Sequence, residues 1–162
     1  MESAVTRVDL AGRRGFLAAV GRERGGRLDH YTDVLGALDP GIVPLVRAFD
    51  NAVATPIFSC EGHWERRSEP YVTFLVLPGR RCQFDRFLTR ILNETPSSLA
   101  CFQFVHRHHP KRAGNGPFID WSVSLSIPFG CITAAEAYAE FKRTTIARFA
   151  CYFRRQFSRF DE

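Results

Sequence analysis

The sequence predicts a single α+β domain in which a mostly antiparallel sheet is covered by helices. A length of 162 residues is typical of one domain and allows a substantial core. A hydrophobic fraction of 45% and an aromatic fraction of 13% belong to a folded chain rather than a disordered one. The apolar period also alternates between helix and strand, which gives the order α-β-β-α-β-β-α.

The first 28 residues are rich in glycine and arginine, and they predict a short helix with frayed ends or a mobile arm ahead of the domain at residues 29–162. Apolar residues then recur at helical spacing, namely Ile42, Leu45, Val46 and Phe49. Residues 39 and 40, Asp and Pro, supply a cap and a first-turn proline. A helix of about three turns, ending near residue 51, is therefore expected.

Two strands are expected next, at residues 55–59 and 71–77. The second is apolar on both faces, which predicts a central position in the sheet. Pro78 and Gly79 end it, and a further amphipathic helix follows with Phe84, Phe87 and Ile91 on one face.

A third strand is predicted at residues 99–106, followed by a polar, basic loop at 106–117. Residues 119–127 alternate strictly between apolar and polar, which predicts a strand with one buried and one wetter face. Thr133 and Glu136 have the spacing of a capping box and predict the start of the last helix. The broad aromatic face of that helix predicts that it packs on the core.

Charge and cysteine content limit the class of protein. The net charge of +5 is compatible with an anionic partner, either nucleic acid or a phosphorylated small molecule. No apolar stretch resembles a signal peptide or a membrane span, so a cytoplasmic protein is expected. The five cysteines form no CxxC pair and are expected to be free thiols, mostly inside apolar runs. Cys60 is the exception, because it lies in a polar turn.

The turn at residues 59–63, Ser-Cys-Glu-Gly-His, is the strongest candidate site. Gly62 suggests a backbone with positive φ or a close approach. Cys60 and His63, at i and i+3, can face the same side of a tight turn. The chemistry that follows has several alternatives, one of which is a plain corner where Cys60 packs and His63 and Trp64 cap the sheet.

Two alternatives use Cys60 and His63 directly. In the first, Cys60 is a nucleophile and His63 is its base, oriented by Glu61 or a distant carboxylate. In the second, both bind zinc, because thiolate and imidazole suit that metal. His106, His108 or His109 would then complete the ligand set.

The favoured interpretation is a binding loop, with the thiol and backbone N–H groups contacting a ligand. The residues expected to form this pocket are Ser59, Glu61, Gly62, Trp64, Tyr71 and the His106 end of the third strand. Asp120 is expected to orient His63 or His106 if these residues meet.

The segment at residues 42–77 carries two resemblances. Ser-Cys-Glu-Gly-His followed by a Pro-Tyr-Val-Thr-Phe strand resembles a set of small uncharacterised bacterial and phage proteins. More distantly, the helix, strand and turn over residues 42–77 are similar to the tRNA wybutosine-synthesising methyltransferases, whose turn reads S-S-C-S-G-R. Ser59, Cys60 and Gly62 match that turn, whereas His63 replaces its arginine. This second resemblance implies S-adenosylmethionine as a cofactor and tRNA as a substrate.

These observations predict a pocket at residues 59–63 for an anionic or nucleotide-like ligand, with group transfer on a nucleotide or nucleic acid as the reaction if the chain is an enzyme. One alternative is a non-enzymatic interaction protein of phage or defence systems. Another is a metal-binding protein or hydrolase that uses Cys60, His63 and the histidines at 106–109. The sequence leaves the cofactor open between S-adenosylmethionine and zinc, and it leaves the oligomeric state open.

Overall fold

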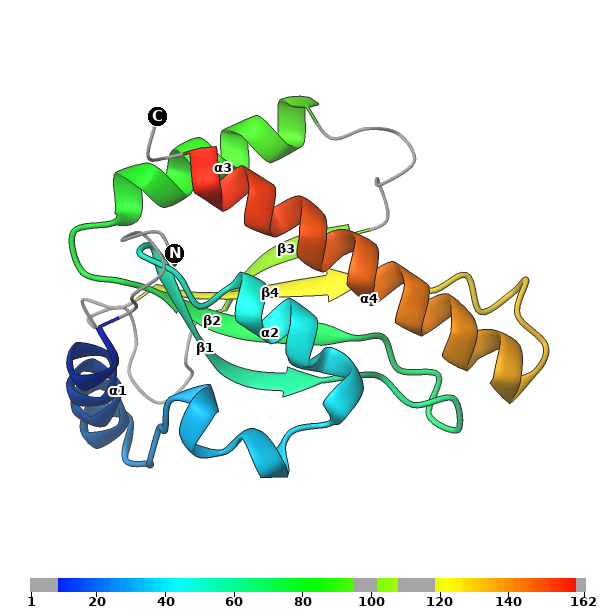
Figure 1. The fold of residues 1–162 in the computed structure, drawn as a ribbon, viewed down its shortest axis with the longest axis horizontal. Helices are drawn as coiled ribbons and strands as arrows, with labels where there is room; N and C mark the ends of the chain where they lie inside the picture. The colour runs from blue at the N-terminus through cyan, green and yellow to red at the C-terminus, as the bar shows by residue number, and fades with distance from the viewer. Residues whose placement is uncertain (1–8, 95–101, 108–118, 160–162) are drawn as a thin grey trace, which may run out of the picture.

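The computed structural model describes residues 9–94, 102–107 and 119–159, and it confirms an α+β fold. A four-stranded antiparallel sheet has the order β1-β2-β4-β3 (Figure 1). Its strands are β1 (Ala54–Cys60), β2 (Tyr71–Val76), β3 (Phe102–Arg107) and β4 (Ile119–Leu125). The helices are α1 (Leu10–Arg24), α2 (Val43–Ala48), α3 (Arg81–Glu94) and α4 (Ala135–Ser158). Three short 3₁₀ turns, η2 (Tyr31–Asp33), η3 (Leu35–Ala37) and η4 (Pro40–Ile42), connect α1 to α2.

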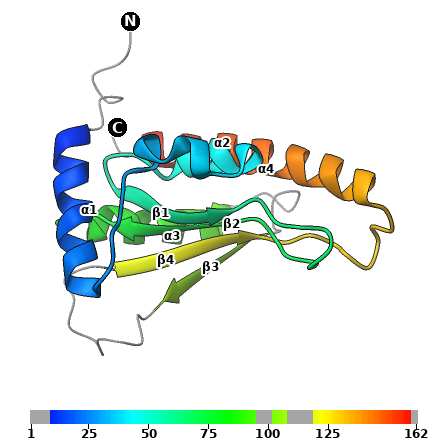
Figure 2. The same cartoon turned by 90° about the horizontal axis from the view of Figure 1, so that it is seen from below.

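Phenylalanine packing joins α2, α3 and α4 to one face of the sheet. Phe49, at the end of α2, stacks on Phe74 of β2 with ring centroids 4.5 Å apart. It also meets Phe153 of α4 at 5.3 Å, and Phe87 of α3 stacks on Phe157 of α4 at 4.0 Å. Figure 2 shows α2 and α4 lying together above the strands. The aromatic face predicted for the last helix is therefore the face that covers the sheet.

Strand β2 is central, as its apolar character predicts, and β1 is an edge strand. The β1–β2 register shifts between Pro56 and Phe58, so that one extra residue lies on β1. An edge strand next to a bulge is where a proline can be accommodated within a sheet. The bulge places Ser59 opposite Val72 and Cys60 opposite Tyr71, and it thereby decides which residues of the turn meet β2.

Helix α1 packs against the other face of the sheet, at one end. Leu17 and Val20 form a small cluster with Leu75 of β2. Arg24, in the last turn of α1, donates two hydrogen bonds to the Asp120 carboxylate of β4, at 2.7 and 2.5 Å. Because of this ion pair Asp120 is only 6% exposed, so the prediction that the polar face of β4 is the wetter one is wrong here.

Three smaller expectations need correction. The helix expected from the cap at Asp39 to about residue 51 ends earlier and begins with a 3₁₀ turn, since η4 precedes an α2 of only six residues. Thr133 does not cap α4: its N-cap is Ala134, without a side-chain hydrogen bond, and Tyr138 N donates to Ala134 O as the first helical bond. The described cysteines are free thiols, as expected, yet Cys82, Cys131 and Cys151 are exposed rather than buried.

Among the described helices, none combines the length and the apolar character needed to cross a membrane.

The Arg24–Asp120 pair predicts an unequal response to two aspartate deletions. Asp120→Ala leaves the Arg24 guanidinium, 17% exposed, without its partner, and the free energy of unfolding should fall by about 3–5 kcal/mol. Asp85→Ala removes a 3.9 Å surface pair with Arg81 and should change it by less than about 1 kcal/mol. Urea titration measures both. Equal losses would mean that the α1 contact does not hold the helix on the sheet.

Candidate functional site

The turn that follows β1 is closely packed around Gly62. Gly62 is buried and has φ +83°, a conformation that side chains other than glycine rarely adopt. A Cβ atom at this position would lie 2.5 Å from the Tyr138 hydroxyl and 2.6 Å from the Ser68 carbonyl oxygen. The glycine is therefore required both by its backbone conformation and by the close approach of α4.

Hydrogen bonds fix the turn within its own loop and to α4. The His63 backbone N–H donates to Ser68 Oγ at 2.8 Å, and Ser68 N–H donates back to the His63 carbonyl at 3.1 Å. From α4, Tyr138 donates its hydroxyl to the Ser68 carbonyl at 2.9 Å, and Lys142 Nζ donates to the Gly62 carbonyl at 3.4 Å. The turn is thus held on both sides before any ligand arrives.

Asp39, Cys60 and His63 converge at this turn. One ligand atom from each residue (a carboxylate oxygen, the thiol sulfur and a ring nitrogen) lies within 4.8 Å of the other two, and all three residues are half-buried. Asp39 precedes η4 as its N-cap but makes no side-chain capping bond there. Its carboxylate accepts the Glu61 backbone N–H at 3.3 Å instead. The Gly62 N–H donates to Cys60 Sγ at 3.4 Å.

The shape of this cluster can be compared with two chemistries. In a nucleophile–base–carboxylate relay the imidazole ring stands between the thiol and the carboxylate, because it uses one nitrogen for each partner. Here the Cys60 sulfur and the Asp39 oxygen approach the same ring nitrogen of His63 and each other within 4.8 Å. A compact triangle of this kind is what the ligands of a single ion form.

Charges around the turn are mostly negative. Burial first, and then the electrostatic effect of Cys60, Glu61, Glu65 and Glu69, together raise the pKa of Tyr138 to about 12. Lys142 offsets part of this charge through an ion pair with Glu61, with Nζ 3.5 Å from Oε1. An acidic neighbourhood disfavours the anionic ligand expected at this turn and favours a cation.

Of the other residues expected at the site, some lie at the cluster and one packs beside it. Tyr71 lies directly opposite Cys60 in the β1–β2 ladder, so it borders the cluster. Glu61 lies in the turn, where its carboxylate accepts the Gly41 N–H at 3.1 Å. Trp64 packs against Tyr138, with centroids 5.6 Å apart, and under the Arg67 guanidinium, which makes it part of a side cluster rather than a ligand wall.

Ser59 lies opposite Val72, a core residue. Its Oγ is buried, and in the part of the chain that the structure describes it has no hydrogen-bond partner. The adjacent cavity measures about 30 Å³, which is room for a water but not for a ligand.

The expected convergence of His106 and Asp120 on this turn is wrong. Across the sheet, Cys60 pairs through β2 and β4 with Gln103 of β3, which is three residues from His106. His106 is therefore about 10 Å from Cys60 along the strand direction and three strand spacings of about 4.8 Å across the sheet. Asp120 is bound by Arg24 and lies opposite Leu75 of β2, four residues along the strand from Tyr71, so it does not reach the turn. His108 and His109 lie outside the described residues.

Asp39 is the member of the cluster that sequence patterns did not reveal. It is 21 positions upstream of Cys60, and its place before a proline has the more common explanation of a helix cap. The structure shows that the Asp39 carboxylate makes no capping hydrogen bond and is therefore available to the cluster. No feature of the sequence indicates this.

The chain matches no protein-family model, no curated protein and no solved structure. The two resemblances within residues 42–77 therefore stay predictions.

The close packing of Gly62 predicts a difference between two glycine substitutions. Gly62→Ala adds a methyl group against Tyr138 and Ser68 and should lower the free energy of unfolding by more than 2 kcal/mol, on the order of other overpacking and strain effects. Gly79→Ala is the matched control, because Gly79 has φ +73° but open space around its Cβ position. Denaturant titration should therefore show a smaller loss, about 1 kcal/mol, for Gly79→Ala. Equal losses would mean that only the backbone conformation matters.

The Tyr138 hydroxyl predicts an alkaline loss of stability. Since its pKa is raised from 10.0 to about 12 in the fold, its contribution is fully present below pH 10 and is lost as pH rises toward 12. Tyr138→Phe should remove this part of the pH dependence. The check is the difference in unfolding free energy between wild type and variant from pH 8 to 12, which should narrow as pH rises. A constant difference would contradict the assignment.

Proposed function

We propose that this chain is a zinc-binding protein whose metal is held by Asp39, Cys60 and His63. The observation that carries the proposal is the convergence of an oxygen, a sulfur and a nitrogen ligand atom within 4.8 Å of one another. Small adjustments of three side chains would bring such atoms to the bonding distances of zinc, about 2.0–2.3 Å. The acidic surroundings supply the charge that a divalent cation needs.

The donor set favours zinc over other metals. Calcium and magnesium prefer oxygen ligands, whereas a thiolate with an imidazole and a carboxylate suits zinc. The outer contacts are also of the kind that supports metal ligands. Backbone N–H groups of Glu61 and Gly62 donate to the Asp39 carboxylate and the Cys60 sulfur, so both acceptors are oriented.

Among the described residues three side chains converge as ligands, which leaves one position of a tetrahedral site open, the arrangement of catalytic rather than structural zinc. When bound in this way, zinc supplies a water of lowered pKa, the basis of metal-assisted hydrolysis. Within the chain, Lys142 lies beside the turn, where its ion pair with Glu61 and its hydrogen bond to the Gly62 carbonyl hold the ammonium in place. We therefore infer hydrolysis as the reaction class.

Metal binding is tested with the full chain after removal of bound metal. Zinc should bind with about one equivalent per chain, and cobalt should give the near-ultraviolet charge-transfer absorption of a thiolate ligand. Cys60→Ser should abolish that absorption, and His63→Ala or Asp39→Asn should weaken zinc binding by more than about tenfold, which even an outer-shell partner can cause.

Cys82→Ser is the matched control, because Cys82 is an exposed free thiol away from the turn, and it should leave binding and absorption unchanged. Zinc binding that is equally tight in the wild type and in Cys60→Ser would refute the site.

A further inference from the structure

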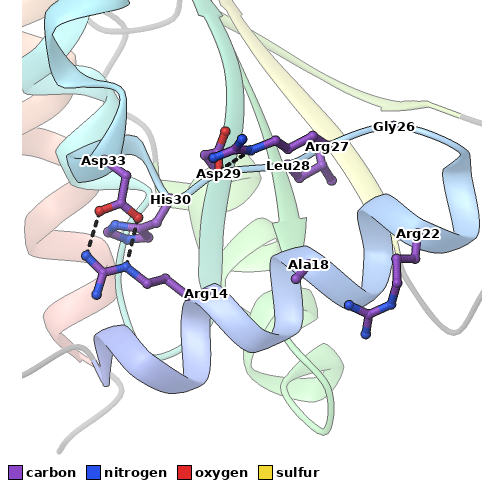
Figure 3. A pocket seen from close by; sticks show the side chains of 9 residues that line it. All are labelled: Arg14, Ala18, Arg22, Gly26, Arg27, Leu28, Asp29, His30 and Asp33. Carbon is purple, nitrogen blue, oxygen red and sulfur yellow. Dashed lines mark hydrogen bonds and ion pairs between the residues drawn. The ribbon is translucent and has the colours of Figure 1, made fainter.

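A second cavity lies beside α1, on residues that the turn does not use. It has a volume of about 530 Å³, within the range of small-molecule sites. One wall is α1, with Arg14, Ala18 and Arg22, and the other is the segment of residues 26–33. Figure 3 shows Arg14 and Asp33 at one end and Arg22 near the other, with Ala18 between them on the helix.

Local packing fixes both walls. At the end of α1, Gly26 N–H donates to the Gly21 carbonyl at 2.9 Å, and a Cβ on Gly21 would lie 2.6 Å from Gly26 O. At the other end, His30 is 1% exposed and its ring contacts Thr32 Oγ1 at 2.8 Å and Asp50 Oδ1 at 3.0 Å. The segment is thus held close to α1 at one end and anchored to the domain at the other.

The cavity is lined by three arginines with most of their N–H groups unused. Arg14 gives two of its five donors to Asp33, at 2.8 and 2.6 Å, and Arg27 gives one to Asp29 at 2.9 Å. Arg22 is exposed and has no partner among the residues that the structure describes. The aspartates hold two of the guanidinium groups in position, and the remaining forks suit an oxyanion.

We propose that this cavity binds a phosphorylated sugar or nucleotide through Arg14, Arg22 and Arg27. The phosphate matches the guanidinium forks. Sugar hydroxyl groups can donate to the carboxylate lone pairs of Asp29 and Asp33 that the arginines do not use. A ligand with only carboxylate groups has no donor for these lone pairs. The side chains of Ala18 and Leu28 offer apolar surface for a sugar ring or a base. This site is independent of the zinc site.

Isothermal titration of the full chain with AMP, ribose 5-phosphate and adenosine tests the proposal. One or both phosphate esters should bind, and adenosine should bind at least about tenfold more weakly, the loss expected when charge-assisted hydrogen bonds are removed. If only AMP binds, the ligand class is a nucleotide. If ribose 5-phosphate binds as tightly as AMP, the ligand class is a sugar phosphate. Failure of both esters to bind, or adenosine binding as tightly as AMP, would overturn the proposal.

Two pairs of variants locate the binding. Arg22→Gln should weaken binding of the phosphate ester about tenfold, whereas Arg148→Gln, an equal charge change on the exposed face of α4, should not. Ala18→Leu should block the cavity, whereas Ala11→Leu, at an exposed position of the same helix, should not. Equal effects within either pair would refute this location.

Cys60→Ser should bind the ester as the wild type does. Failure of the zinc site and failure of this cavity are therefore observed separately.

Discussion

The burial of the aromatic face of α4 is the interaction on which the rest of the structure depends. Phe149, Phe153 and Phe157 are fixed in the core between the sheet and the neighbouring helices. The helix has 24 residues and is therefore about 36 Å long, so its first turns extend past the core toward the end of β1. There Tyr138 and Lys142 bind the turn through its backbone carbonyls. Core packing and the geometry of the candidate site are thus coupled through one rigid element.

The distribution of charge distinguishes two candidate ligand sites that the net charge alone does not distinguish. A formal charge of +5 favours an anionic ligand, and the sequence assigned that ligand to the most unusual turn. The turn is acidic, however, and its donor atoms suit a cation. The arginines that suit an anion lie beside α1 instead. Local charge, rather than the total, decides which ligand each site favours.

Sequence periodicity was sufficient for the α+β class and for the type of most elements, because the apolar pattern of each element follows the core that it helps to build. The apolar run of β2 predicted its central position, and the aromatic face of α4 predicted its packing on the core. The site was predictable only within the turn itself. Asp39 joins Cys60 through tertiary packing of η4, and the strand order, which no periodicity encodes, separates His106 from the turn. The bulge after Pro56 shifts the pairing by one residue, a change that also has no clear sequence signal.

The rigidity of the turn argues for an ion rather than for a ligand enclosed by a closing loop. Closure would require His63 or Trp64 to move, yet Ser68 holds both backbone groups of His63, and Trp64 packs on Tyr138. Gly62 has no space to shift toward α4. A metal ion gains from donors that are fixed in advance, because binding then requires little reorganisation. A turn with so little freedom is suited to holding a small cation, and a larger ligand would have to bind at its open side, where Tyr71 borders Cys60.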